Sequence, residues 1–348
     1  MLRTLIVGLG RAGLGLHWHV LRRLRASEQH AGFFSAEPPV ACDIRDIRGI
    51  AAENGLVAAG SLAEAPNLLD PATTMVHLCT PPTTRLAALQ ELAELGFRWM
   101  VVEKPLATDQ ETLDAIVRLA DVRRLRIGVV SHWLDSELTR RAIGFTRSAE
   151  LGTLRAISVV QRKPRLSRTL RAGDHPTAFD VELPHSLGVA LRIAGDAKVT
   201  DAACTDLRIG DLVVPRMGAA HLVLQHGRGA RSEIFSDLGS PLRERRITLD
   251  FEGGRLVGYY PGSQDDHYAH LTVYREGGAA QSVFRDDSLA AFLTRLYQDA
   301  GRGADFSANF AFNAKVAAML CDAKSRFIGP PLAYLPDPAV TGAVDHVS

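Results

Sequence analysis

The sequence predicts an α/β domain built on a doubly wound parallel sheet, followed by an α+β domain with an open, largely antiparallel sheet. The chain has 348 residues, enough for about two ordinary domains. Short apolar runs alternate with helical patterns up to residue 130, whereas alternating segments separated by glycines follow. We therefore expect one domain over 1–130, a second over 131–335 and a surface tail over 336–348.

Apolar runs mark the strands of the first domain, because parallel strands covered by helices on both faces are near-continuously apolar. These runs lie at 2–7, 40–42, 75–79, 99–102 and 127–130. The clearest helix between them spans 108–120, with apolar residues spaced three and four apart. Thr108 and Glu111 form the pattern of a capping box at its start.

The second domain is expected to combine hairpins with two closing helices. Strands with alternating or β-branched residues lie at 154–160, 221–225, 231–236, 246–251 and 255–260. The closing helices span 288–298 and 309–324, each with large apolar side chains along one side.

Charge and composition exclude several classes of partner. The 40 lysine and arginine residues nearly balance the 39 aspartate and glutamate residues, so no overall field draws the protein to nucleic acid or to an acidic membrane. The sequence has no uninterrupted run of about 18 apolar residues, so no membrane span is predicted. The four cysteines are scattered without a CxxC pair, and the N-terminus lacks the pattern of a signal peptide. We therefore expect a cytoplasmic protein.

A glycine-rich loop follows the first expected strand directly. Its sequence, Gly8-Leu9-Gly10-Arg11-Ala12-Gly13, has the GxGxxG spacing and precedes a helical pattern. Such a loop needs Gly8 for a tight turn, Gly10 for the close approach of a pyrophosphate, and Gly13 for close packing of helix on strand. The helix N-terminus then faces the phosphates. The sequence thus predicts a Rossmann domain that binds a dinucleotide through this loop, including Arg11 and Ala12.

Asp43 follows the second expected strand, where an acidic side chain accepts hydrogen bonds from the ribose hydroxyls of adenosine. This position favours NAD as the cofactor. Asp43 lies 30 residues after Gly13, a longer spacing than usual that fits a longer helix and the loop 32–39. Arg45 lies two residues further and is placed to meet a 2′-phosphate instead, so NADP is the alternative.

Lys104 follows the strand at 99–102, within the segment Glu103-Lys104-Pro105. Ligands bind at the carboxyl ends of the strands in open α/β sheets. Beside a nicotinamide, a lysine there can polarise a carbonyl oxygen or share in moving the hydroxyl proton as a hydride leaves carbon. Lys104 is therefore placed for such chemistry, but from its position alone a solvated lysine at a strand end is the favoured alternative unless other features match.

The glycine-rich loop, the turn Cys79-Thr80-Pro81-Pro82, the segment Glu103-Lys104-Pro105 and the later change to hairpins occur together in this chain. In this combination the chain resembles the Gfo/Idh/MocA family of glucose-fructose oxidoreductase-like and inositol dehydrogenase-like enzymes. The resemblance implies that Lys104 is catalytic and contacts the substrate. It also implies that Thr80 and Pro81 line the nicotinamide side and that Glu103 belongs to the cofactor site. The second domain would carry the substrate site and pair in a homodimer or homotetramer.

The resemblance further implies a catalytic histidine on a helix between the domains. His185 matches its spacing, because Gly195 follows after ten residues. A histidine suits proton transfer near neutral pH, so His185 is the expected acid or base, with a buried structural histidine as the alternative. Where the family usually has an aspartate four residues earlier, this chain has Val181. Asp180 or Glu182, on either side of it, is expected to orient His185 or to bind a neighbouring hydroxyl.

Two further departures from the family concern the substrate. Arg85 stands where the family commonly has a histidine, and Ser131-His132-Trp133 where it often has an arginine. We therefore expect a substrate other than a standard sugar of the family, contacted by His132 and Trp133.

A basic run over 161–171 lies just before the histidine motif. Guanidinium groups bind carboxylate or phosphate through two hydrogen bonds. Arg162 and Lys163 are therefore expected to contact a substrate with an anionic group, such as a sugar acid, a sugar phosphate or a nucleotide sugar. The alternative is a solvated loop or a contact between subunits.

No metal site is expected. His17 and His19 lie two apart on a helix and face different ways, and the loop with Asp265, Asp266, His267 and His270 has no second group of ligands.

The sequence therefore predicts an NAD(P)-dependent oxidoreductase. It would transfer a hydride between nicotinamide and a carbonyl or hydroxyl carbon of a sugar, cyclitol or sugar-acid-like substrate, with Lys104 polarising the reacting oxygen and His185 exchanging its proton. Two alternatives stay open. One is a reductase of C=N bonds on the same fold, motivated by Val181. The other is a dinucleotide-binding sensor or scaffold without catalysis.

Overall fold

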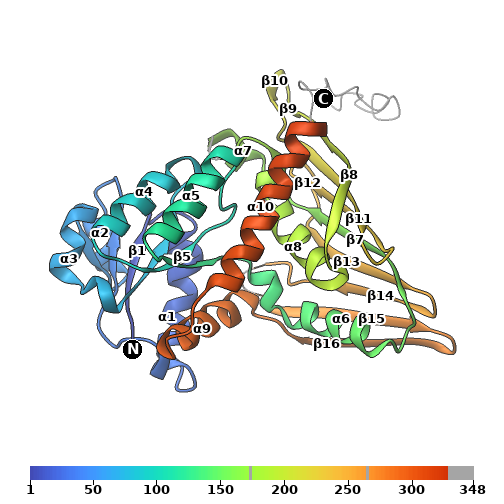
Figure 1. The fold of residues 1–348 in the computed structure, drawn as a ribbon, viewed down its shortest axis with the longest axis horizontal. Helices are drawn as coiled ribbons and strands as arrows, with labels where there is room; N and C mark the ends of the chain where they lie inside the picture. The colour runs from blue at the N-terminus through green and yellow to red at the C-terminus, as the bar shows by residue number, and fades with distance from the viewer. Residues whose placement is uncertain (172–174, 264–265, 328–348) are drawn as a thin grey trace, which may run out of the picture.

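The structure, a computed structural model, describes residues 1–171, 175–263 and 266–327. A parallel sheet lies on one side and a larger, mostly antiparallel sheet on the other, with helices between and around them (Figure 1). This arrangement confirms the expected fold class. The expected tail over 336–348 and Asp265 lie outside the described residues.

The first sheet is parallel throughout, in the order β3-β2-β1-β4-β5-β6. Its strands are β1 (Arg3–Val7), β2 (Val40–Cys42), β3 (Val57–Ala59), β4 (Thr74–Leu78), β5 (Trp99–Val102) and β6 (Arg126–Val129). Strand β3 adds to the five expected strands; it is a three-residue strand at the edge of the sheet. The chain reverses its direction of travel across the sheet between β3 and β4. The crevice beyond the ends of β1 and β4 is therefore the place where such a sheet binds ligands.

Helices cover both faces of this sheet. One apolar cluster contains side chains of α1 (His19–Ala26) and α2 (Arg48–Glu53), and another contains those of α3 (Ala65–Leu68), α4 (Pro82–Glu94) and α5 (Gln110–Val122). Helix α5 begins later than the sequence predicts. The Asp109 carboxylate accepts a hydrogen bond from the Thr112 main-chain N–H at 2.7 Å, so Asp109 caps the helix, and the expected cap at Thr108 is wrong.

Within the described residues, the second sheet has eight strands in the order β16-β15-β14-β13-β7-β12-β11-β8. Their bounds are β7 (Leu154–Arg162), β8 (Ala197–Cys204), β11 (Ala219–His226), β12 (Arg231–Asp237), β13 (Glu244–Phe251), β14 (Gly254–Tyr259), β15 (Tyr268–Arg275) and β16 (Gly278–Arg285). Strands β8, β15 and β16 were not predicted, nor was the small ribbon of β9 (Leu207–Ile209) and β10 (Leu212–Val214). Because β7 and β12 pair in parallel, the sheet is mixed rather than a set of hairpins only.

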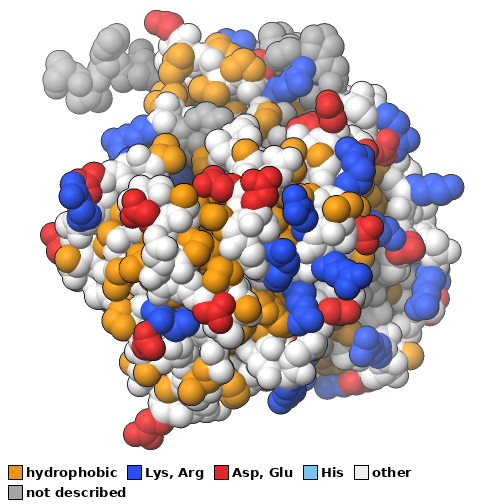
Figure 2. Space-filling model, turned by 60° about the vertical axis from the view of Figure 1, so that its left-hand side comes forward, with side chains coloured by type: hydrophobic (Ala, Val, Ile, Leu, Met, Phe, Trp, Pro, Cys, Tyr) orange, Lys and Arg blue, Asp and Glu red, His pale blue; other side chains and the backbone are white. Residues whose placement is uncertain are grey.

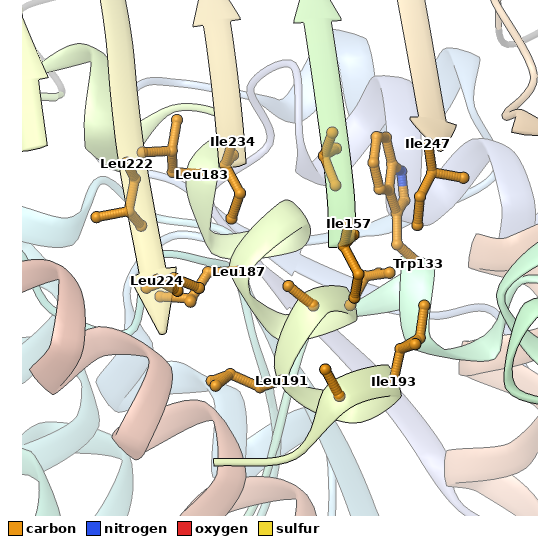
Figure 3. Packing of buried hydrophobic residues seen from close by; sticks show 14 of the residues in the cluster. Trp133, Ile157, Leu183, Leu187, Leu191, Ile193, Leu222, Leu224, Ile234 and Ile247 are labelled. Atoms are coloured by element: carbon orange, nitrogen blue, oxygen red, sulfur yellow. The ribbon is translucent and has the colours of Figure 1, made fainter. Parts of the chain in front are cut away.

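Helix α8 (Leu183–Ala194) is the element that joins the core of the second domain to the ligand crevice. Leu183, Leu187 and Leu191 lie against the sheet, whose facing side chains come from β7, β11, β12 and β13 (Figure 3). Nearly every residue of α8 is buried, because the sheet covers one side and α10 (Ser307–Phe327) another. Its first turn, which carries His185, is consequently fixed in place. The remaining helices of this region are α6 (Glu137–Ser148) and α7 (Leu166–Arg171).

The two closing helices return to the parallel sheet. Phe292, Leu296 and Tyr297 of α9 (Ser288–Gly301) are buried in the same apolar cluster as α1. Helix α10 runs between the two sheets in Figure 1 and contacts β6, α5 and α8. The C-terminal part of the described chain thus holds the two halves of the molecule together.

The surface carries charges of both signs. Figure 2, in which the side of the parallel sheet comes forward, shows basic and acidic side chains across the same face with hydrophobic ones between them. Among the described residues, the search for a long apolar helix able to cross a bilayer finds none.

Candidate active site

A cleft of about 1160 Å³ opens between the carboxyl edge of the parallel sheet and the first turn of α8. Most of the expected site residues line it, although they come from distant parts of the chain. They are Gly8, Gly10, Arg11, Ala12, Asp43, Thr80, Pro81, Glu103, Lys104, His132, Trp133, Lys163, Glu182 and His185. Gly13, Arg162 and Asp180 do not line the cleft.

The glycine-rich loop has the geometry that a bound pyrophosphate requires. Gly8 has φ of +88°, a conformation that a residue with a side chain rarely adopts. A Cβ at Gly13 would lie 2.0 Å from the Gly8 carbonyl oxygen, so the helix approaches the strand as closely as glycine allows. A Cβ at Gly10 would meet no heavy atom within 4 Å, so the backbone there faces open space. The loop fits a dinucleotide phosphate group in the cleft.

Asp43 closes the far end of the loop. Its carboxylate accepts hydrogen bonds from the Leu9 main-chain N–H at 2.7 Å and from the Arg45 guanidinium at 2.9 Å. Arg45 lowers the pKa of Asp43 to about 2, so the carboxylate is ionised at neutral pH. The Arg45 side chain is largely exposed. The Asp43 carboxylate and the Arg45 guanidinium therefore both lie where they could contact the adenosine ribose of a bound dinucleotide.

The loops after β4 and β5 are held to each other by Arg85. This side chain is buried, and its guanidinium donates hydrogen bonds to the main-chain carbonyls of Thr80 and Pro105. The Thr80 hydroxyl is buried and has no hydrogen-bond partner among the described residues, so it is free to bind a ligand in the cleft. Arg85, which stands where the family commonly has a histidine, therefore lies behind the site and holds these two loops together through their main-chain oxygens.

Lys104 extends from the end of β5 into the cleft. Its ammonium nitrogen Nζ donates a hydrogen bond to the Val181 carbonyl oxygen at 2.6 Å, and no carboxylate of the described residues lies within ion-pair distance of it. Burial lowers the pKa of Lys104, and the nearby charges of Arg165 and Arg168 lower it further, against the opposing effect of Glu182 and Glu103. A lysine with a lowered pKa is a stronger acid than a solvated one.

The two carboxylates expected near His185 have separate surroundings. Glu182 precedes the first turn of α8 and forms a buried ion pair with Lys163. Burial acts to raise the pKa of Glu182, but Lys163, Lys104 and Arg245 outweigh it and keep the group ionised. The Asp180 carboxylate instead accepts a hydrogen bond from the Thr177 hydroxyl at 2.8 Å and forms an ion pair with Lys324 at 2.6 Å. Asp180 therefore joins α10 to the histidine segment from outside the cleft.

His185 lies in a cage of aromatic rings. Its ring stacks on that of Trp133 at 5.7 Å between centroids and meets the His132 ring edge-on at 4.5 Å. Trp133 in turn stacks on Tyr260 at 4.1 Å. Burial, followed by the charges of His132 and Lys104, lowers the pKa of His185 well below its usual value. His185 is therefore neutral near pH 7, and its Nδ1 has no hydrogen-bond partner among the described residues.

Cations are in excess on the second-domain side of the cleft. Arg168 of α7 and Arg11 of the glycine-rich loop line it, and neither side chain has a hydrogen bond or ion pair among the described residues. Burial, followed by the charges of Arg11 and Arg165, lowers the pKa of Arg168 to about 10. Arg162 of the same basic run instead points to Glu244, 3.6 Å away, and is half exposed. The run thus contributes to the cleft through its lysine and its later arginines.

Several lining residues were not expected from the sequence. Arg245, His175 and Tyr260 reach the cleft from β13 and from loops of the second domain. No local motif marks them: Arg245 and Tyr260 lie on and just after the hairpin strands β13 and β14, and His175 lies in a loop. Arg168 is different, since it belongs to the basic run that the sequence singles out. Among the described residues, the structure shows no group of three metal-ligating side chains.

Comparison with known proteins gives a family and several relatives. Residues 2–131 match the family described as "Oxidoreductase family, NAD-binding Rossmann fold", the Gfo/Idh/MocA family. A curated relative, UDP-N-acetylglucosamine 3-dehydrogenase of Acidithiobacillus ferrooxidans, is 25% identical over 248 residues, which cover 67% of this chain and 75% of that protein.

Solved structures share the fold over nearly the whole chain. A 3-ketoreductase from Actinomadura kijaniata, solved with NADP and TDP-benzene, aligns with a TM-score of 0.78 at 16% identity and covers 96% of this chain and 99% of that one. An oxidoreductase from Agrobacterium radiobacter, solved with NAD⁺, L-tartaric acid and magnesium, aligns with a TM-score of 0.73 at 15% identity over 93% and 96% of the two chains.

Proposed function

Because this chain belongs to the Gfo/Idh/MocA family of oxidoreductases with an NAD-binding Rossmann domain, we propose that it transfers a hydride between nicotinamide and a carbonyl or hydroxyl carbon of a sugar-like substrate. One observation carries the proposal. Lys104, with a lowered pKa, and neutral His185, whose Nδ1 has no hydrogen-bond partner in the described structure, line one cleft with the glycine-rich loop. An acid and a base that share a cleft are what an alcohol–ketone interconversion requires.

In the reductive direction a proton must reach the carbonyl oxygen as the carbon is reduced. When bound, the nicotinamide supplies or accepts the hydride. The Lys104 ammonium polarises the oxygen by donating a hydrogen bond to it, which its lowered pKa strengthens. Protonated His185 delivers the proton, the reverse of its role in oxidation. The Val181 carbonyl holds Nζ in place from the α8 side.

In the oxidative direction a base must remove the hydroxyl proton. Neutral His185 accepts it, since its lowered pKa keeps the ring unprotonated near pH 7. Glu182, paired with Lys163 and close enough to Lys104 and His185 to affect the pKa of each, offsets part of the positive charge there. In this assignment Asp180 positions the histidine segment through Lys324 and does not touch the substrate.

The excess of cations implies a substrate with an anionic group. Among the described residues, the partly buried Arg168 side chain has no hydrogen-bond or ion-pair partner, and burial of such a charge is costly unless an anion meets it. UDP-N-acetylglucosamine, for which one relative is named, and TDP-benzene, bound in a similar structure, are diphosphate compounds. Another similar structure holds the dicarboxylic acid tartaric acid. A nucleotide sugar or a sugar acid fits this side chain, whereas a neutral free sugar leaves it without a partner.

Cofactor absorbance tests the proposal directly. NADH and NADPH are offered separately with keto-sugars, keto-inositols, keto-sugar acids, keto nucleotide sugars and cyclic imines, using wild type, Lys104→Ala and Lys198→Ala. Lys198 lies on β8, exposed and outside the cleft, and is the matched control. We expect turnover of an anionic keto compound that is lost in Lys104→Ala and kept in Lys198→Ala.

Three results would contradict this. Turnover of imines alone would favour a C=N reductase. NADH binding without any turnover would favour the sensor. Full activity in Lys104→Ala would contradict the role assigned to Lys104.

A further inference from the structure

A chain of hydrogen bonds runs through the interior of the Rossmann domain, directly behind the cleft. Glu103 Oε1 contacts His17 Nε2 at 3.0 Å, and His17 Nδ1 contacts His77 Nδ1 at 2.7 Å. His77 Nε2 then contacts the Tyr297 hydroxyl at 2.9 Å, which contacts the Thr4 hydroxyl at 2.7 Å. Apart from a small part of Glu103, these side chains are buried. The chain links the residue beside Lys104 to helix α9.

Two arrangements of protons satisfy every bond in this chain. In the first, His17 is an imidazolium and donates to Glu103 and to His77, and the bonds continue as donors toward Thr4. In the second, His17 is neutral, and every bond beyond it points the opposite way. The two differ by one proton on His17, so the charge of this side chain fixes the direction of the whole chain.

The surroundings favour the charged form of His17. A buried carboxylate needs a cation, and within the described part of the chain the basic side chain that hydrogen-bonds Glu103 is His17. Burial opposes the charge on His17, but Cys79 and Glu103 beside it outweigh burial and raise its pKa. Burial and the His17 charge lower the pKa of His77, which then accepts.

We propose that His17 is a positioning residue for the reaction: as the buried counter-ion of Glu103, it turns that carboxylate away from Lys104 and leaves the Lys104 ammonium without an ion-pair partner. The proposal rests on the proposed function of Lys104 as the cation that polarises the reacting oxygen. Glu103 Oε1 faces His17, and the one donor to Oε2 in the described part of the chain is the Lys104 main-chain N–H, at 3.2 Å. The Lys104 side chain reaches past it to Val181.

The consequence for Lys104 follows from the charges around it. The groups that act on its ammonium are Glu103, Glu182, Arg165 and Arg168. When His17 is charged, its positive charge beside Glu103 largely cancels the effect of the Glu103 carboxylate on Lys104. Without that cation, Glu103 would stabilise the Lys104 ammonium, raise its pKa and make it a weaker acid.

The test measures the titration of Lys104 in the protein without cofactor or substrate. Trace acetylation with acetic anhydride is followed across pH by mass spectrometry of the Lys104 peptide, because only the uncharged amine reacts. The variants are His17→Gln, the double variant His17→Gln/Glu103→Gln, and Tyr297→Phe. Tyr297→Phe is the matched control, since it breaks the same chain without changing a charge near Lys104.

We expect His17→Gln to move the Lys104 titration midpoint upward by about one pH unit, which is roughly tenfold less free amine at a given pH. The double variant removes one positive and one negative charge and returns the midpoint to the wild-type value. Tyr297→Phe leaves it there. A wild-type midpoint in His17→Gln, or an equal upward shift in the double variant, overturns the proposal.

A second measurement keeps the proposal testable if His17→Gln does not fold. In wild type with ¹⁵N-labelled histidine, we expect the His17 ring to show two protonated nitrogens at pH 7. One bare ring nitrogen at His17 overturns the proposal. Both experiments are independent of turnover, so a protein in which Lys104 titrates as expected but Lys104→Ala stays active would contradict the proposed function and not the role of His17.

Discussion

His185 is held in its neutral form by burial and by the charges of His132 and Lys104, which lower its pKa well below 6.5. A base with a lowered pKa keeps its activity until the pH falls below that value. We therefore expect kcat/KM for alcohol oxidation to decline only below pH 6.5. His185→Asn should lower kcat by about 10²- to 10⁴-fold, as expected for loss of a general base. Steady-state rates across pH check this; a decline centred above pH 6.5 would assign the base to another group.

We expect Asp43 to determine which dinucleotide binds more tightly. Its ionised carboxylate lies at the end of β2, where it accepts hydrogen bonds and repels a 2′-phosphate. We expect NADH to bind more tightly than NADPH, and Asp43→Ala to weaken NADH about tenfold or more while sparing NADPH. Fluorescence titrations with both cofactors measure this. Tighter NADPH binding in wild type, lost in Arg45→Ala, would show that Arg45 reads a 2′-phosphate instead.

The sequence identifies individual site residues where their signal is local. Gly8, Gly10 and Lys104 each belong to a short motif beside a strand, so their positions follow from the order of elements alone. His17 gives the opposite case, because its partners Glu103 and His77 come from two other strands. From the sequence it is only a histidine on a helix. Pairwise contacts between distant segments decide what such a residue does.

Helix α10 is tied to the histidine segment by one buried ion pair. The Lys324 ammonium donates to Asp180 and to the Thr108 carbonyl, both at 2.6 Å. Removing one partner leaves a buried charge unpaired, so Lys324→Met should lower the free energy of unfolding by about 3 kcal/mol. Lys315 on the same helix pairs with exposed Asp196, so Lys315→Met should cost less than about 1 kcal/mol. Urea unfolding of both variants measures the difference, and equal losses would contradict this account of α10.

The elements that the sequence predicts best are those with continuous apolar faces. Buried strands such as β4 and β5 appear as apolar runs, continuous in β5 and broken in β4 only by His77 after its first residue. Strands β8 and β16 have exposed residues along much of their length and lack that pattern, so they do not stand out. Their register is set by pairing with β11 and β15, which a single segment does not encode.

Acid should destabilise the whole molecule. Burial lowers the pKa of His77, His132 and His185 in the folded state, to about 4 for His132, and ordinary histidines titrate near 6.5 when unfolded. The unfolded state therefore takes up more protons as the pH falls, and folding free energy is lost below pH 6.5. The loss is about 1–2 kcal/mol for each histidine between pH 7 and pH 5. His17, whose pKa is raised, acts the opposite way, because its stabilisation is fully present below pH 6.5 and is lost as the pH rises.

Urea unfolding at pH 7 and pH 5 measures this dependence. His132→Asn removes one of the titrating groups, so we expect a shallower dependence on pH in that variant. Equal stability of wild type at the two pH values would contradict the assignment of buried neutral histidines.

At the scale of the molecule, the sequence predicts two sheets but not how they are joined. The helices over 288–298 and 309–324 are expected as part of the second domain, yet α9 and α10 pack on the parallel sheet. Their apolar faces indicate that these helices are buried, but they do not indicate which sheet the helices pack against. The cleft depends on the packing of α9 and α10 against the parallel sheet. Tyr297 of α9 contacts His77 behind Lys104, and Lys324 of α10 contacts Asp180 near His185.

The central claim is that Lys104 and His185 serve hydride transfer in the cleft. The most direct measurement is the fate of deuterium from [4,4-²H₂]NADH, or the matching NADPH, incubated with a keto substrate from the panel and wild type or Lys104→Ala. We predict deuterium on the former carbonyl carbon with wild type, detected by mass spectrometry, and none with Lys104→Ala, although that variant still binds the cofactor. Cofactor binding by wild type with no deuterium in any product, or equal incorporation by both proteins, would contradict the account.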